Sequence, residues 1–163
     1  MKQFSLTNFQ ARILSNNIES AEKGFTKNDL RMLDAVQDII IDATKEYHDT
    51  VEGILLRYRN LVRRATAAKD VNEVTALSAR QTIEIEDANE KLGKRKATLL
   101  FEDAQYEFIK AHWNEKDALP GGRETRNDFF AVEDAVANPE TAKIEDGKVV
   151  PMRKKKDEDS GSA

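Results

Sequence analysis

Cysteine is absent from the 163-residue sequence, which excludes disulfides, thiolate metal sites and a cysteine nucleophile. Proline and glycine are scarce, with 3 and 7 residues, so few positions force a helix to end. No apolar run approaches the roughly 18 residues that predict a membrane span, and the first residues lack the apolar stretch of a secretory signal. We therefore expect a soluble, cytoplasmic protein without a membrane segment.

The residues that are present suit a modest apolar core with a strongly charged surface. Charged residues make up 34% of the chain and hydrophobic residues 39%, as in a single small domain. The formal net charge is −4, so the molecule as a whole is not a basic nucleic-acid binder. Contact with phosphates would have to come from local basic clusters.

Two helical patterns occupy the first part of the chain. Apolar residues recur every three to five positions over residues 6–22, which predicts an amphipathic helix there. Gly24 follows where such a helix would end, because glycine tolerates the left-handed conformation of a helix terminus. Thr26 and Asp29 have the spacing of a capping box, so a second helix is predicted to begin at that point.

The second helical pattern is the longest in the sequence. Steps of three or four separate its apolar residues over residues 30–65 without a proline, which predicts one helix about 60 Å long. Gly53 is its weakest position and a candidate kink. The short turn between the two helices predicts an antiparallel helical hairpin. Because the second helix is about twice as long as the first, later segments or another chain would have to cover its far half.

A third, shorter helix is predicted from Asp70, and the pattern then becomes ambiguous. Residues 82–86 alternate as in a half-buried strand, and residues 97–101 form a second candidate strand, which together predict a small β-hairpin. The alternative is a continuing helix, because apolar residues over 85–92 also keep helical spacing. The predicted fold class is mainly α with a minor β component.

The last third of the chain contains two further helical patterns. An aromatic-rich helix is predicted from Asp103 and a short one over residues 129–136. Few apolar residues and opposed charge blocks predict a disordered tail over residues 140–163. The expected organisation is therefore a folded unit over residues 1–119, a linker with a short helix over 120–139, and the tail.

Residues suited to catalysis are few and scattered. The two histidines, His48 and His112, lie far apart in the sequence and belong to no metal-ligand motif. Glu84 and Glu86 would share one face of a strand, an arrangement used in acid–base chemistry but also typical of a solvated face. No glycine-rich phosphate loop or nucleophile elbow occurs. We expect no enzymatic activity, no metal, no cofactor and no small-molecule substrate.

Two sets of residues are candidates for binding a partner. An apolar seam in the far half of the long helix would be buried against another protein subunit or a second copy, with flanking arginines setting the register. The seam consists of Val51, Ile54, Tyr58, Leu61 and Val62. Basic residues form the second set, which would meet phosphates if the chain were a nucleic-acid-associated accessory protein, although cations also suit helix C-termini and exposed loops. This set consists of Arg57, Arg63, Arg64, Lys94, Arg95 and Lys96.

The layout of the predicted elements resembles that of small helical proteins encoded among the head and tail genes of tailed bacteriophages. The shared features are a short helix, a glycine turn, a long capped helix, a β-hairpin and an aromatic-rich helix that ends in FIKAHW at residues 108–113. Residues 127–136 add to the resemblance, which covers about residues 6–136. It implies a virion component or an assembly factor, located in the virion or the host cytoplasm, and it identifies no functional residues.

Overall fold

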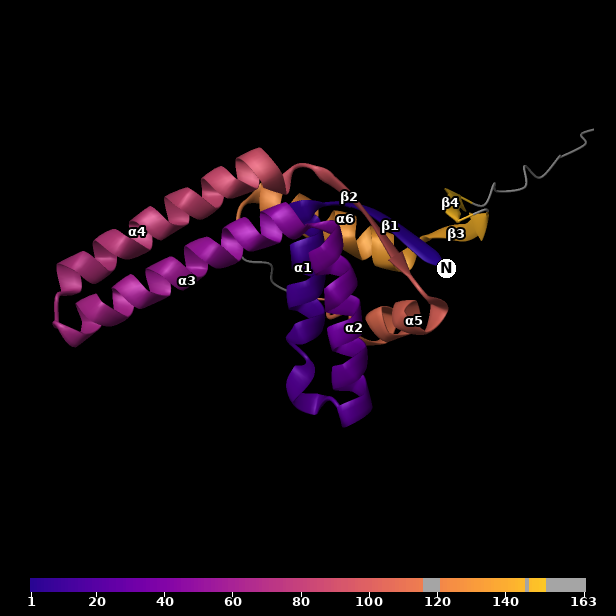
Figure 1. Ribbon diagram of the computed structural model, residues 1–163, viewed down its shortest axis with the longest axis horizontal. Helices are drawn as coiled ribbons and strands as arrows, with labels where there is room; N and C mark the ends of the chain where they lie inside the picture. Colours follow the sequence, from indigo (N-terminus) through magenta and orange to yellow (C-terminus); the bar gives the residue numbers. More distant parts are fainter. Residues whose placement is uncertain (116–120, 146, 152–163) are drawn as a thin grey trace, which may run out of the picture.

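The computed structural model describes residues 1–115, 121–145 and 147–151, and it is mainly helical with a minor antiparallel sheet, as the sequence predicts (Figure 1). The elements are β1 (Lys2–Thr7), α1 (Asn8–Glu19), α2 (Lys27–Ala43), α3 (Lys45–Ala67), α4 (Val71–Ala88), β2 (Lys96–Phe101), α5 (Asp103–His112), α6 (Arg123–Ala137), β3 (Glu140–Glu145) and β4 (Lys148–Pro151). Two single turns, η1 (Glu22–Gly24) and η2 (Asn89–Gly93), complete the described part of the chain.

The sheet begins with a strand that the sequence reading missed. Strand β1 pairs antiparallel with β2 along its whole length, and the strand order is β2-β1-β3-β4. Phe4 and Leu6 alternate inward from β1 and are fully buried. Helix α1 therefore begins at Asn8, two residues later than the sequence predicts. Thr7 caps it, because its hydroxyl accepts a 3.1 Å hydrogen bond from the backbone N–H of Gln10.

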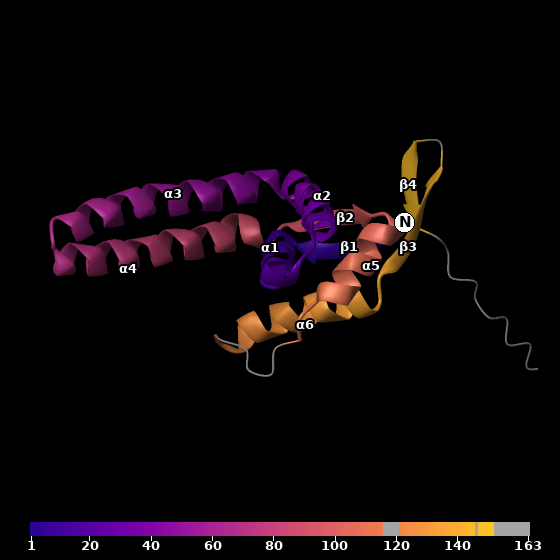
Figure 2. The ribbon, with the colours of Figure 1, turned by 90° about the horizontal axis from the view of Figure 1, so that it is seen from below.

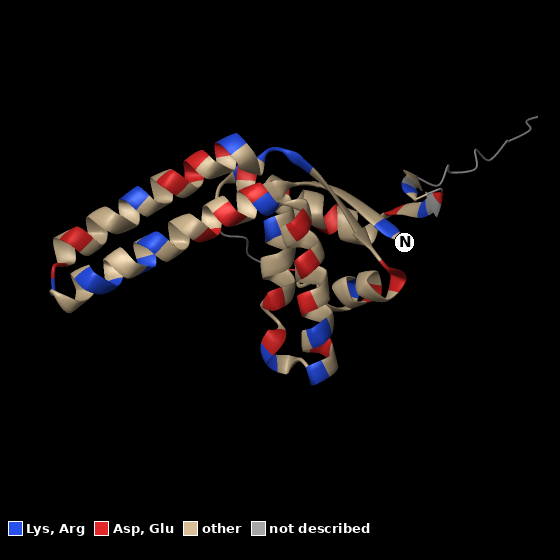
Figure 3. Ribbon diagram, in the orientation of Figure 1, with Lys and Arg blue, Asp and Glu red and all other residues tan. Residues whose placement is uncertain are grey.

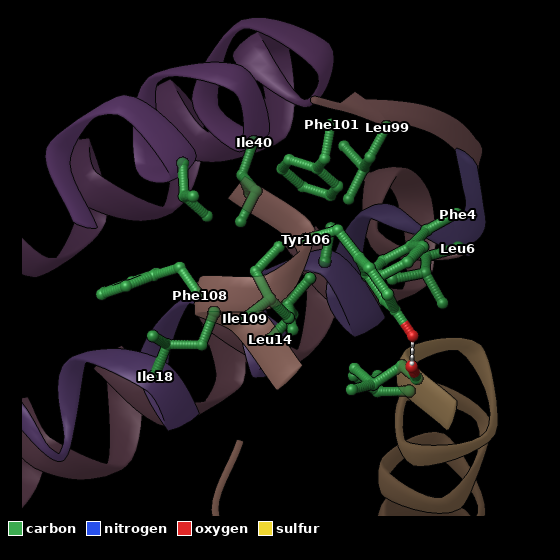
Figure 4. Packing of buried hydrophobic residues seen from close by; sticks show 14 of the residues in the cluster. Phe4, Leu6, Leu14, Ile18, Ile40, Leu99, Phe101, Tyr106, Phe108 and Ile109 are labelled. Carbon is green, nitrogen blue, oxygen red and sulfur yellow. Dashed lines mark hydrogen bonds between the residues drawn. The ribbon is translucent and has the colours of Figure 1, made fainter. Parts of the chain in front are cut away.

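The main core lies between these strands and the helices α1, α2, α5 and α6 (Figure 4). The ring of Phe4 meets that of Phe101 edge-on, with centroids 5.3 Å apart. Ile109 of α5 is completely buried in the same cluster. The hydroxyl of Tyr106 donates a 2.9 Å hydrogen bond to the carbonyl of Val136, which joins α5 to the end of α6. The core therefore unites segments from both ends of the described chain.

The predicted long helix is two helices, which is a correction to the sequence reading. The break falls at the buried Thr44, whose hydroxyl donates a 2.7 Å hydrogen bond to the carbonyl of Ile40. Its φ of −119° and ψ of 24° leave the helical region, so α3 takes a new direction away from α2 (Figure 1). Gly53, the predicted weak point, lies inside the regular helix α3.

The strand predicted over residues 82–86 was also wrong. Helix α4 continues through it to Ala88 and into η2, as the alternative reading proposed. Asp70 caps this helix by accepting a 3.0 Å hydrogen bond from the backbone N–H of Glu73. A tight turn with Lys69 at φ 56° sends α4 back along α3. Strand β2 exists as predicted but pairs with β1.

The C-terminal part carries more structure than predicted. Helix α6 begins well before residue 129, and its Val132 and Val136 belong to the main core. Strands β3 and β4 form a hairpin in the segment that was expected to be disordered, and Ala142 of β3 is buried. Residues 152–163 lie outside the described part. The division into 1–119, 120–139 and 140–163 stays a prediction.

Candidate functional site

Helices α3 and α4 form an antiparallel arm that projects from the core (Figures 1 and 2). We call this helical pair, with the turn at its far end and residues 89–95 at its root, the arm. Two small apolar clusters hold it together. Tyr47, Val51 and Ala88 form the cluster near the core, while Tyr58 and Leu77 belong to the one near the tip. The arm therefore has its own interior, separate from the main core.

The structure places the predicted interface seam mostly inside the arm, which corrects the expectation that another subunit covers it. Val51 and Tyr58 are only 2% and 5% exposed beneath α4. Ile54 and Val62 are half-buried at the margin of the same helix pair. Only Leu61, at 36%, is an exposed member of the set. Helix α4 covers the seam instead. This matches the alternative prediction that a later segment folds back on the long helix.

The root of the arm is fixed to the core by specific contacts. The Tyr47 hydroxyl hydrogen-bonds Asn89 Oδ1 at 2.7 Å, and burial raises the pKa of that phenol, against the opposing charge of Arg12. Asn8 Nδ2 donates to the carbonyl of Leu92 at 3.0 Å. A Cβ at Gly93 would lie 3.3 Å from Phe9 Cβ, so only glycine fits this close approach without displacement. Asn8 and Phe9 of α1 thus hold the root of the arm against the core.

A groove of about 640 Å³ runs along one side of the arm near its root. Ile54, Ala88 and Leu92 contribute apolar surface to it, and Ile83 stands beside them with 64% of its surface exposed. Ion pairs border this apolar surface. These are Arg57 with Glu84, Lys91 with Asp87 at 2.9 Å, and Arg95 with Glu46 at 2.9 Å. The groove therefore offers an apolar strip between charges of both signs.

The arm also holds most of the exposed large apolar side chains in the described part of the chain. Four of six such residues lie on it, and these are Leu56, Leu61, Val71 and Ile83. The other two are Leu30 and Phe130. Of these four residues, only Leu61 belongs to the seam that the sequence predicts to bind a partner. Ile83 was missed because its alternation with Ile85 was read as a strand, whereas helical spacing carries Ile83 to the outside of α4.

The six predicted phosphate-binding residues fall into two separate groups. Arg57, Lys94 and Arg95 pair with carboxylates, and the hydrogen bond to Glu90 raises the pKa of Lys94. Exposed pairs of this kind contribute little to stability, because solvent and salt screen the charges. All six are exposed, including the remaining three, Arg63, Arg64 and Lys96. Arg64 lies near the tip and Arg95 at the root, about 30 Å apart at 1.5 Å per helical residue.

The residues considered for catalysis are not grouped together, since His48 lines a pocket with Glu19 and Glu52 whereas Glu84 and Glu86 lie on α4. Helical spacing separates Glu84 from Glu86, so the predicted carboxylate pair on one strand face was wrong. His112 packs between aromatic rings, 4.6 Å from both Phe25 and Phe108 by ring centroids. Among the described residues, no three or more His, Asp or Glu side chains are grouped so that they could hold a metal ion. None of the described helices has the length and apolar character needed to cross a membrane.

Comparison with protein-family models, with curated proteins and with solved structures finds no match to this chain. The arm is therefore the candidate functional site on the strength of its own geometry.

Proposed function

We propose that this chain is a non-enzymatic structural or assembly protein that uses its arm to bind another protein. The observation that carries the proposal is the concentration of exposed apolar side chains on the arm, at Leu56, Leu61, Val71 and Ile83. Exposed apolar groups that lie together mark interaction sites, because their burial releases free energy that the isolated chain cannot gain. Ile83 meets this condition, since it lines the groove beside Ile54 and Leu92. The contacts between the root of the arm and α1 support the proposal further, since groups ordered before binding lose less conformational freedom on binding.

A role as a virion component or assembly factor rests on the resemblance in layout to proteins from phage head and tail genes. The aromatic-rich helix α5 and the capped helix α2 are present in the structure. The long unbroken helix and the β-hairpin over residues 82–101 are not. The proposal of protein binding therefore depends on the arm, and the phage setting depends on the remaining shared layout.

The test is to purify the tagged full chain from its native host and compare its co-purifying proteins between two double variants. Leu61→Asp with Ile83→Asp places two charges on the arm. Leu30→Asp with Phe130→Asp makes the same change at exposed apolar positions off the arm. We expect the first to abolish a specific association and the second to retain it. Equal loss or equal retention would contradict the proposal, once circular dichroism shows both variants folded.

Nucleic-acid binding is the second candidate, and one observation favours it. The stretch from Arg57 to Lys69 contains five basic residues and no acidic one, and Arg63 and Arg64 within it are exposed. Binding through these residues would weaken steeply with salt, because phosphate contacts release counterions. Fluorescence anisotropy with labelled duplex and single strands, from low to high salt, tests this reading. Arg63→Glu with Arg64→Glu should remove the binding, and absent binding at low salt excludes it.

A further inference from the structure

Basic and acidic residues both occur along the arm (Figure 3), and its two halves differ in net charge. Arg57 and Glu84 pair with each other at the boundary between the halves and are left out of both. The tip half, residues 58–80, then contains five basic and two acidic residues, a net charge of +3. The root half, residues 45–56 and 81–95 without Glu84, contains four basic and six acidic residues, a net charge of −2. A surface with this polarity is complementary to itself when two copies run in opposite directions. Two copies side by side in the same direction would place like charge against like charge.

The apolar residues on the groove side cluster about the middle of the arm. Ile54, Arg57 and Leu61 follow one another at steps of three and four, so they lie on one side of α3. Arg57, near the midpoint of α3, pairs across the arm with Glu84, which lies in the C-terminal third of α4, and Ile83 stands next to that pair on α4. Relative to Arg57, Ile54 lies toward the root and Leu61 toward the tip.

We propose that a second copy of this chain docks on the groove side of the arm, antiparallel, so that the two arms form a four-helix bundle. This rests on the proposed function and names the partner. A two-fold axis near the midpoint brings Ile83 of one copy to Ile83 of the other. It also sets Leu61 of each copy over the region of Ile54 in the other. Each positive tip half then covers a negative root half, and the contact is self-complementary as two-fold interfaces are.

The first test is sedimentation equilibrium of the full chain over a range of concentrations, with matched variants of two exposed leucines on α3. We expect the wild type to approach twice the 18.4 kDa mass of one chain. Ile83→Asp and Leu61→Asp should each raise the dimer dissociation constant about tenfold or more, as the loss of one well-packed apolar anchor does. Leu56→Asp, on the opposite side of α3 from the groove, should leave it unchanged. A wild type that stays monomeric at every concentration overturns the proposal.

The second test fixes the orientation and uses the natural absence of cysteine. Ile83→Cys should form an intermolecular disulfide under mild oxidation, because the two-fold axis passes close to it. Val71→Cys, at the tip, should remain a thiol, because antiparallel arms carry their tips to opposite ends. Crosslinking of Val71→Cys instead would show a parallel pair and overturn the proposed arrangement. A monomeric chain whose arm variants still lose a different co-purifying protein would refute the dimer and leave the proposed function standing.

Discussion

The hydroxyl of Tyr47 lies 2.7 Å from Asn89 Oδ1, and this contact joins the first turn of α3 to the turn that follows α4. It closes the arm at its root, where both helices meet the core. Tyr47→Phe should lower the free energy of unfolding by about 0.5–1.5 kcal/mol, the net contribution of one hydrogen bond. Urea denaturation followed by circular dichroism measures this change. Tyr58→Phe is the control, because no hydrogen bond from the Tyr58 hydroxyl occurs within the described residues, and its effect should be smaller.

Two glycines of the arm should respond in opposite ways to alanine. Gly93→Ala should destabilise the protein by about 1 kcal/mol or more, because the new Cβ would meet Phe9 Cβ at 3.3 Å and Tyr47 Cε2 at 3.6 Å. Gly53→Ala should stabilise it by about 0.5–1 kcal/mol, since nothing lies within 4 Å and the position is inside a helix. Thermal melts of both variants give the comparison. Stabilisation by both substitutions would show that the root is not closely packed.

The start of α2 should make stability depend on pH in the acid range. Hydrogen bonds from the backbone and hydroxyl of Thr26 hold the pKa of Asp29 below its ordinary value of 3.8. A lowered folded-state pKa gives stability that is present above the unfolded pKa and is lost as pH falls through the folded pKa. Asp29→Asn should therefore flatten the fall in unfolding free energy below about pH 4. An unchanged acid slope would mean that the capping box is not formed in solution.

Helix α6 should depend on α5 for its attachment to the core. Tyr106→Phe removes the 2.9 Å hydrogen bond to the buried carbonyl of Val136, and an unsatisfied buried carbonyl costs about 1–3 kcal/mol. Hydrogen exchange should show faster exchange of α6 amides in this variant than of α3 amides. Uniform protection of both helices, equal to that of the wild type, would contradict the role given to this contact.

The sequence predicted the elements whose signals are local. The capping box of Thr26 with Asp29 and the cap at Asp70 appear at the predicted residues, because each depends on atoms within one helical turn. The fold class followed from such signals. The arm's inner seam was also identified as apolar, but which segment covers Tyr58 depends on where α4 returns, and no local pattern specifies that.

The predictions that failed concern segments whose local pattern fits two different secondary structures or helix boundaries. Leu6 fits the apolar face of a helix as well as the inner face of β1, and only pairing with Ala97 in β2 decides between them. Helical spacing runs unbroken across Thr44, and its side-chain hydrogen bond to the carbonyl four residues back also occurs at Thr50 inside α3, so no local pattern marks the break. Ile83 and Ile85 alternate as in a strand, yet they lie within α4. In each case the tertiary context overrides the local preference.

The central claim is that the arm is the surface through which this chain meets its partner. A photo-crosslinking side chain placed at each exposed apolar position of the full chain in its native host tests this claim most directly. Ile83 and Leu61 on the arm should both crosslink to the same protein. A second copy of this chain would count as that protein. Positions Leu30 and Phe130, off the arm, should give no such product. Crosslinks from Leu30 or Phe130 alone would contradict the claim and place the contact on the core instead.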